Sequence, residues 1–357
     1  MLLETKPELI YLSKQNIIDL GGYKANIYVQ AITQALTLHS ERNFSQPLKP
    51  YLKTNKEGEH IADRIIAMPA YLGEPSISGI KWIGSKFDNP TKKNMERASA
   101  LIILNDPETN FPIAILEGSV ISSMRTAAVT VVAAKYLAKK GFQNVSIIGC
   151  GLISKMHINS LLEQFNHIRQ INLFDLDNVK AKAFAQEMKE RYNHVDFQVK
   201  ESAKNAVEQA EVLVTCTVAD TPYIEADWIQ KGTFVSNISI MDIEKEAFLK
   251  ADKVIVDDWD QANREKKVIN QLVVEGKFSK EMLHAELGDI ITGKKLGRVT
   301  DEEIIILNPM GMAIEDIACA HAIYEKAKQE GLGKVLSLYL AFLSRGTVIG
   351  FNYSSFI

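Results

Sequence analysis

The chain has 357 residues, which is long for one hydrophobic core and comfortable for two domains. Hydrophobic residues make up 46% of it and charged residues 24%, and the net charge is −3, so nothing indicates a general attraction for nucleic acid or anionic membranes. The three cysteines lack CxxC spacing, which argues against a disulfide framework or a zinc site and fits a reducing compartment.

The sequence carries no sign of export, membrane insertion or metal binding. Its first residues lack the charged-then-apolar pattern of a signal peptide, and no apolar run reaches the roughly 18 residues of a membrane span. The seven histidines show no HExxH or related metal spacing. We therefore expect a cytoplasmic protein without a metal, membrane or nucleic-acid partner.

The first third of the chain has the pattern of a mixed α+β domain. A short strand is expected at Ile10–Leu12, with Ser13 as the cap of the next helix, and an amphipathic helix at Ala25–Leu38. Turn-forming residues separate the strands that follow, which favours an antiparallel or mixed sheet. These strands are expected at Pro47–Lys53, Asp63–Ala70, Ser76–Gly84, Ala98–Leu104 and Ile113–Glu117.

A long helix, expected at Ser123–Lys140 and ended by Gly141, leads into a different pattern. Short apolar runs now alternate with helical stretches, which predicts a parallel, doubly wound sheet. A late strand at Glu303–Leu307 and a helix at Gly311–Glu330 complete the chain. The alternating runs are Val145–Ile148, Ile171–Phe174, Val195–Val199, Glu211–Thr215, Thr233–Asn237 and Lys253–Val256.

A glycine-rich turn follows the first of these strands and precedes a helix. Gly149 allows the tight turn, and Gly151 lets a pyrophosphate approach the backbone at the helix N-terminus. The third small position of the pattern is Ser154. Because the strand, the helix and further βα units are all present, the turn predicts a dinucleotide site.

Two further features refine this prediction. Asp175 ends the next strand, where a carboxylate can accept hydrogen bonds from both ribose hydroxyls and repel a 2′-phosphate, so we expect NAD rather than NADP. The alternative is that Asp175 only caps a helix. Thr217 and Val218 follow the fourth strand, where such folds touch the adenine-ribose side or the pyrophosphate, although a plain strand end has the same appearance.

Three basic residues occupy positions at which the predicted fold itself does not require a positive charge. Lys81 shares a strand face with Ile77 and Ile83, although an edge-strand lysine would also explain it. Arg64 opens a strand and has a surface charge as its alternative. Arg125 is expected in the first turn of the long helix, where a cation opposes the helix dipole by roughly a few tenths of a kcal/mol and a bound anion would offset this. Together they favour a substrate with several carboxylates.

One acid completes the candidate site. Asp242 follows the strand Thr233–Asn237, near the carboxyl edge of the parallel sheet, where open α/β sheets hold their ligands. It is a candidate general base, or a group that orients a water and an amine. The alternative is a helix N-cap before Ile243–Leu249.

These segments together resemble the ornithine cyclodeaminase/μ-crystallin family. The marks are the Lys81 strand, Ser123–Ala128, the turn that begins at Gly149, and Gly311–Asp316. The resemblance implies an α/β fold: a Rossmann doubly wound parallel sheet at 127–310, and a split α+β substrate-binding and dimerisation domain at 1–126 that 311–357 completes. It also implies a homodimer.

Further segments resemble the NAD-dependent dehydrogenases of this family that oxidise the secondary amine of a glutamate conjugate. That resemblance implies hydrolysis of the imine to 2,3-diaminopropionate and 2-oxoglutarate, with NADH, for siderophore or other nonribosomal biosynthesis. The segments are Asp63–Pro69, Gly79–Lys86, Asn94–Ser99, Val256–Trp259, His284–Gly288 and Asn308–Gly311.

The resemblance also implies roles for individual residues. Arg64, Lys81 and Arg125 match substrate-carboxylate ligands, and Lys81 and Asp242 are the expected catalytic residues, with Asp242 handling the amine and the water. The expected NAD contacts are Arg125, Thr126, Gly149, Gly151, Leu152, Ile153, Asp175, Thr217, Val218 and Gly311.

Other functions on the same scaffold stay open. An ornithine cyclodeaminase would keep NADH within one catalytic cycle and release ammonia and proline. A simple imine or amino-acid dehydrogenase would act on a smaller substrate, and a μ-crystallin-like protein would bind cofactor and ligand without catalysis. The basic segment Lys86–Arg97 favours the larger acid, and the acid at position 242 favours an enzyme.

Overall fold

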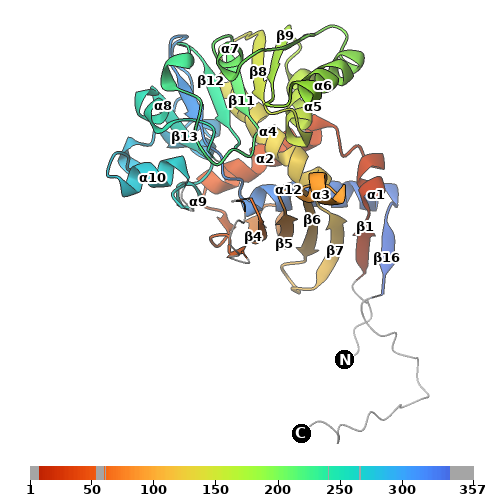
Figure 1. The fold of residues 1–357 in the computed structure, drawn as a ribbon. Helices are drawn as coiled ribbons and strands as arrows, with labels where there is room; N and C mark the ends of the chain where they lie inside the picture. Colours follow the sequence, from red (N-terminus) through yellow and green to blue (C-terminus); the bar gives the residue numbers. More distant parts are fainter. Residues whose placement is uncertain (1–7, 54–59, 61, 240, 265–266, 338–357) are drawn as a thin grey trace, which may run out of the picture.

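The computed structural model describes residues 8–53, 60, 62–239, 241–264 and 267–337. Two β-sheets organise this part of the chain, one above the other in Figure 1, with the helices α2, α4 and α12 between them. These helices are Ala25–Ser40, Ser119–Leu137 and Ala313–Glu330. The expected fold class, a parallel Rossmann-type sheet beside a separate mixed sheet, is confirmed.

The first sheet is mixed, as the turn-rich sequence predicted. Its strands lie in the order β16-β1-β7-β6-β5-β4-β2, with β3 also paired to β4, and only the β1–β7 pair is parallel. The strands are β1 Leu9–Leu12, β2 Phe44–Ser45, β3 Tyr51–Leu52, β4 Arg64–Gly73, β5 Ser76–Ser85, β6 Ala98–Asn105, β7 Pro112–Glu117 and β16 Lys334–Leu336. The short helices α1 Lys14–Asp19, capped by Ser13, and α3 Asn89–Lys93 accompany it.

The second sheet is wholly parallel, in the order β10-β9-β8-β11-β12-β15-β13-β14. The chain proceeds outward from β8 in one direction and from β11 in the other, so the sheet reverses its winding between these two strands. The strands are β8 Asn144–Ile148, β9 Gln170–Phe174, β10 Asp196–Val199, β11 Val212–Thr215, β12 Phe234–Asn237, β13 Lys253–Val256, β14 Ala285–Glu286 and β15 Ile305–Leu307. The α-helices that accompany them are α5 Leu152–Gln164, α6 Asn178–Arg191, α7 Ala203–Val207, α8 Lys245–Lys250, α9 Trp259–Ala262, α10 Val268–Val274 and α11 Leu287–Ile291.

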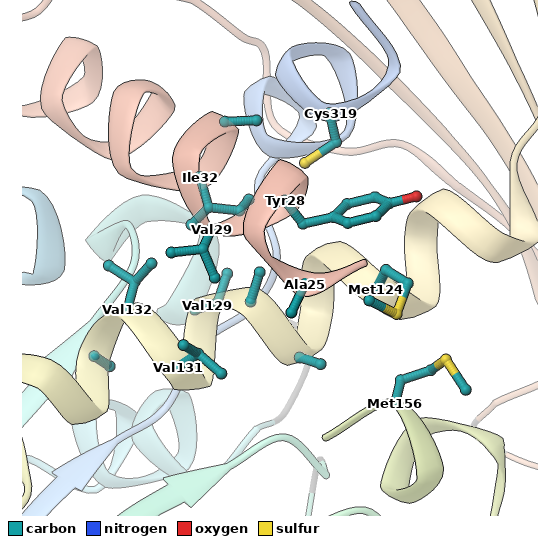
Figure 2. Close-up of a cluster of buried hydrophobic side chains, with 14 of the residues drawn as sticks. Ala25, Tyr28, Val29, Ile32, Met124, Val129, Val131, Val132, Met156 and Cys319 are labelled. Atoms are coloured by element: carbon teal, nitrogen blue, oxygen red, sulfur yellow. The ribbon is translucent and has the colours of Figure 1, made fainter. Parts of the chain in front are cut away.

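The core between the sheets is built on α2 and α4. Figure 2 shows Val29 of α2 beside Val129 and Val132 of α4, with Cys319 of α12 near Tyr28. All five side chains are at most 4% exposed, so helices distant in sequence share one continuous apolar core. The predicted domain boundary between 126 and 127 falls inside α4, which packs against both α2 and α5.

The beginning of the long helix was predicted wrongly. Helix α4 begins at Ser119 rather than Ser123 and ends at Leu137, before Gly141. Arg125 is therefore in the second turn of the helix, so the expected repulsion between its charge and the dipole of a first turn is absent. Ser123 looks like an N-cap in the sequence, but its hydroxyl donates to the carbonyl of Val120 inside the helix.

Other element boundaries also differ from the expected ones. The strand expected at Pro47–Lys53 shrinks to Tyr51–Leu52, and the last helix begins at Ala313 rather than Gly311. Helix α12 and β16 return the chain to the first sheet, while 338–357 lies outside the described residues. Within the described part of the chain, none of the helices combines the length and the hydropathy needed to span a bilayer.

Candidate active site

The glycine turn lies where the second sheet reverses its winding. Gly149 follows β8 with φ +92°, and a Cβ there would stand 3.0 Å from the carbonyl oxygen of Cys216, in the segment after β11. Both requirements select glycine. At Gly151, by contrast, a Cβ would meet no atom within 4 Å, so this position faces open space.

Helix α5 begins directly after the turn with exposed backbone donors. Gly151 is its N-cap and supplies no side-chain hydrogen bond, and Leu152 at its first position is 50% exposed. The Ser154 hydroxyl is turned back to the carbonyl of Gly149, which fixes the turn. Open space in front of unsatisfied helix amides is the arrangement that binds a phosphate.

Asp175 stands at the end of β9, beside this turn. Its carboxylate accepts hydrogen bonds from the amides of Cys150, at 2.8 Å, and Asp177, at 3.1 Å, and pairs with Lys180 at 3.1 Å. Burial works in the opposite direction, but these hydrogen bonds hold the pKa of Asp175 below its ordinary value. The N-cap of α6 is Asp177, so the helix-cap alternative for Asp175 is wrong.

A second group of side chains, the charged cluster, joins Lys81 of β5, Arg125 of α4, and Glu315 and Asp316 of α12. Lys81 Nζ lies 2.6 Å from Asp316 Oδ2, and Arg125 Nε lies 3.0 Å from Asp316 Oδ1. Arg125 Nη1 also donates to Glu315 Oε2 at 2.9 Å. Since β5 lies between β4 and β6 and Lys81 is 1% exposed, the edge-strand alternative for Lys81 is wrong.

Burial sets the charge of this cluster. It lowers the pKa of Lys81 to about 8 and raises the pKa of Glu315 to about 8. Burial opposes the charge of Arg125 as well, but attraction by Asp316 and Glu315 keeps its pKa above the ordinary value. Since burial favours the neutral form of Glu315, Asp316 is the carboxylate that both cations approach, and the cluster suits an added anion.

The loop from Asn308 to Gly311 is held against Arg125 from two sides. Asp257 Oδ2 accepts from the amides of Met310 and Gly311, and Lys49 Nζ donates to the carbonyls of the same two residues. Gly311 has φ +70°, and a Cβ on it would lie 2.4 Å from Arg125 Nη1. Lys49 and Asp257 thus hold from either side the loop that lies against the guanidinium.

Asp242 is fully buried in the segment between β12 and α8. Its Oδ1 accepts a hydrogen bond from the Thr217 hydroxyl, and its Oδ2 has no hydrogen-bond partner among the described residues. Burial raises the pKa of Asp242. The N-cap of α8 is Glu244, so the alternative of Asp242 as a helix cap is wrong.

The structure brings some of the expected residues together and keeps others apart. Lys81 and Arg125 share Asp316, whereas Arg64 lies over the ring of Tyr51, 5.1 Å from its centroid. The Thr126 hydroxyl donates to the carbonyl of Ser122 in its own helix. Ile153 is partly buried, and Val218 is 37% exposed close to the turn.

Several residues of the site were missed from the sequence. Glu315 and Asp316 were noted only as part of a motif, because acids in the first turn of a helix are ordinary. Lys49 fell in an expected strand, where it drew no attention.

A third polar group links α2 to the second sheet. His39 Nε2 lies 2.9 Å from Asp258 Oδ2, and its Nδ1 lies 4.0 Å from Glu286 Oε2. Three such ligand types within 4.8 Å of one another have the composition of a metal site. Asp258 also caps α9, and Glu286 accepts from the amide of Trp259, so each carboxylate already has a structural contact.

Comparisons with known proteins identify the family of the chain. The model of the Ornithine cyclodeaminase/mu-crystallin family matches residues 23–331. The N-((2S)-2-amino-2-carboxyethyl)-L-glutamate dehydrogenase of Staphylococcus aureus (strain NCTC 8325 / PS 47) is 60% identical over 333 residues, covering 93% of this chain and 99% of the relative.

Two solved structures share the fold over almost their whole length. Delta(1)-pyrroline-2-carboxylate reductase of Thermococcus litoralis, in complex with NADH and L-proline, superposes with a TM-score of 0.85 at 30% identity, over 91% of this chain and 99% of the other. An archaeal alanine dehydrogenase dimer with bound NAD gives a TM-score of 0.83 at 32% identity, over 93% of this chain and all of the other.

Proposed function

The chain belongs to the ornithine cyclodeaminase/mu-crystallin family, and we propose that it is an NAD-dependent dehydrogenase of N-(2-amino-2-carboxyethyl)-L-glutamate. The assignment of this substrate rests on the 60% identity, across 93% of the chain, to the dehydrogenase of that compound. The products would be 2,3-diaminopropionate, 2-oxoglutarate and NADH. A role in siderophore or other nonribosomal biosynthesis rests on the resemblance of the sequence.

The residues around the glycine turn fit NAD. The open space at Gly151 and the unsatisfied amides at the start of α5 suit the pyrophosphate, and Asp175 suits the adenosine ribose. Leu152, Ile153, Thr217 and Val218 border this turn. We assign Arg125, Thr126 and Gly311 to the nicotinamide side, because α4 and the loop held by Asp257 meet there.

The charged cluster suits the substrate carboxylate at the reacting carbon. Lys81 and Arg125 would attract that carboxylate, and the N–H groups of Arg125 that Asp316 and Glu315 do not use would donate to it. Such a contact fixes the carbon whose hydride is to leave. Lys81 and Arg125 therefore position the substrate, while Asp316 keeps both cations in place.

Bound NAD would supply the oxidant of the reaction, the acceptor for the hydride of the glutamate carbon that bears the secondary amine. The C–N single bond becomes an imine, and the nitrogen gives up one proton. Asp242, with one oxygen held by Thr217 and the other without a partner, is the group we assign to take that proton and then to orient the attacking water. Addition of water and cleavage of the C–N bond release the ketone of 2-oxoglutarate and the amine of 2,3-diaminopropionate.

We also propose a homodimer formed through the outer face of the first sheet. Trp82 of β5 and Leu101 of β6 are paired across the strands, and each is 47% exposed. Their strand neighbours on the opposite face, such as Lys81 and Ile102, are buried. An exposed apolar pair at the centre of a sheet is typical of a surface that another subunit covers.

The decisive test follows NADH absorbance with purified protein, NAD and one of three substrates: the conjugate, ornithine or glutamate. NADH formation with the conjugate alone, lost in Asp242→Asn and in Lys81→Met, supports the assignment. The exposed pair Lys204–Glu208 provides a control, since Lys204→Met should leave the rate unchanged. Proline from ornithine without net NADH would instead identify a cyclodeaminase, and NAD binding without turnover of any of the three would favour a binding protein.

A further inference from the structure

A tyrosine hydroxyl lies beside the carboxylate of Asp242. Tyr223 belongs to the segment between β11 and β12, and its hydroxyl is within hydrogen-bonding reach of both Asp242 and Thr217. The Thr217 hydroxyl donates to Asp242 Oδ1 and accepts from the amide of Ala219 at 3.1 Å. Two hydroxyl groups from one segment therefore gather at the buried carboxylate.

Backbone hydrogen bonds fix the place of this tyrosine. The amides of Tyr223 and Ile224 both donate to the carbonyl of Asp242, at 3.0 Å and 2.9 Å, and the amide of Glu244 donates to the carbonyl of Ile224 at 3.0 Å. Ile224 and Ile243 also form a parallel bridge. The segments that follow β11 and β12 thus run side by side at the carboxyl edge of the sheet. Because these bonds belong to the main chain, Tyr223→Phe would leave them in place.

The Tyr223 hydroxyl keeps its proton and can act as a donor. Burial raises the pKa of Tyr223, and the neighbouring charge of Asp242 raises it further. For Asp242 the two influences are opposed, since burial raises its pKa while hydrogen bonds from Ser239, Thr217 and Tyr223 lower it. The hydroxyl groups therefore counteract the burial that favours a neutral acid. A base accepts a proton only when it is ionised, so these donors favour the reactive form of Asp242.

Two other titratable groups face this part of the site. Cys216 precedes Thr217, and burial raises the pKa of its thiol to about 12, so it is neutral near pH 7. Asp175, at the end of β9, acts on Tyr223 in the same direction as Asp242, because its charge also raises the pKa of that hydroxyl. Neither group supplies a charge that would replace the hydroxyl donors at Asp242.

We propose that Tyr223 is a positioning residue of the reaction, whose hydroxyl acts through Asp242 by keeping this carboxylate ionised and correctly oriented. The inference rests on the proposed function. Asp242 Oδ2 has no hydrogen-bond partner among the described residues, so it is the oxygen left for the substrate nitrogen and then for the water. Tyr223 itself needs no contact with the substrate.

The test measures kcat and KM for the conjugate against pH, in the wild type and in Tyr223→Phe. Loss of a donor to the ionised carboxylate raises the pKa of Asp242, so the acidic limb of the kcat profile should move to higher pH by about one unit. Below this limb kcat should be about tenfold lower than in the wild type, and at the alkaline end the two should converge. KM should stay unchanged, because the hydroxyl does not touch the substrate.

Tyr192→Phe is the matched control, because the Tyr192 hydroxyl at the end of α6 donates to Asn159 Oδ1 at 2.9 Å. It should leave the pH profile and KM unchanged, and thermal unfolding should show that both variants are folded. A kcat of Tyr223→Phe lowered by the same factor at every pH would indicate a merely structural role and overturn the inference. An unshifted acidic limb or a raised KM would overturn it as well.

Infrared difference spectroscopy of the protein–NADH complex separates this inference from the proposed reaction. Acidification should produce the carboxylic-acid band of Asp242, identified by its absence in Asp242→Asn, and Tyr223→Phe should produce that band at higher pH. If the band moves in this way but the wild type forms no NADH from the conjugate, the action of Tyr223 on Asp242 stands and the proposed reaction falls. If NADH forms and the band does not move, only the inference falls.

Discussion

Gly151 provides a direct test of the cofactor site, because a side chain there would touch nothing in the protein itself. Its backbone, at φ −112° and ψ −170°, is ordinary extended structure, and an added Cβ meets no atom within 4 Å. We therefore expect Gly151→Ala to leave the unfolding free energy unchanged or raise it by about 0.4–1 kcal/mol, through the loss of freedom in the unfolded chain. The added methyl group would nevertheless stand where we place the pyrophosphate.

The added methyl group should therefore have an unfavourable effect on NAD binding and none on the stability of the free protein. Displacing the pyrophosphate from the start of α5 should weaken NAD binding by at least tenfold, which is about 1.4 kcal/mol. Calorimetric titration gives the Kd, and thermal unfolding with and without NAD shows whether the stabilisation by the cofactor is lost.

Gly141 supplies the matched control for this variant. It has φ +70° and equally open surroundings, so Gly141→Ala should cost about 1 kcal/mol of stability and leave the Kd for NAD unchanged. Unaltered NAD binding in Gly151→Ala would refute the placement of the pyrophosphate at this turn, since a pyrophosphate bound against Gly151 leaves no room for a methyl group.

Three further predictions concern charge, pH and assembly. Asp316→Asn removes the carboxylate shared by Lys81 and Arg125, and urea unfolding should show a loss of about 3–5 kcal/mol, against less than about 1 kcal/mol for Glu208→Gln in an exposed pair. Burial lowers the pKa of His157 from 6.5 to about 4, so the unfolded chain takes up the proton first; the melting temperature should fall as pH drops from 6.5 towards 4, and less steeply in His157→Gln. A double variant Trp82→Glu/Leu101→Glu should be monomeric by light scattering, whereas Leu296→Glu, at a 70% exposed position outside the first sheet, should not change the assembly; a dimer in both would place the interface elsewhere.

Most of the longer strands of both sheets could be predicted because their apolar periods are clear and turn formers bound them, whereas the short strands β2, β14 and β16 were not predicted. The beginning of α4 could not, because its N-cap is Gly118, which supplies no side-chain hydrogen bond, while the Ser122–Ser123 pair imitates one. The strand expected at Pro47–Lys53 failed for a different reason. Its first residues are committed to the tertiary contact between Lys49 and the loop at Gly311, which no local pattern reports.

The candidate site divides in the same way. Gly149, Gly151 and Asp175 could be found because the strand–turn–helix context fixes their geometry within one segment. The partners of Lys81 and Arg125 come from α12, about 190 residues after Arg125, and their acids look like ordinary first-turn residues. The sequence thus predicts which cations are unusual, but the carboxylates that control their charge appear only when the first sheet is closed by the end of the chain.

The proposed function also limits what the charged cluster can select. On that proposal, the buried cations Lys81 and Arg125 would bind the carboxylate on the reacting carbon, which alanine and proline carry as well. Contacts with this carboxylate alone would not distinguish these small amino acids from a larger conjugate, since binding both equally gives no discrimination. Discrimination would then come from a part of the site that the smaller molecules do not reach.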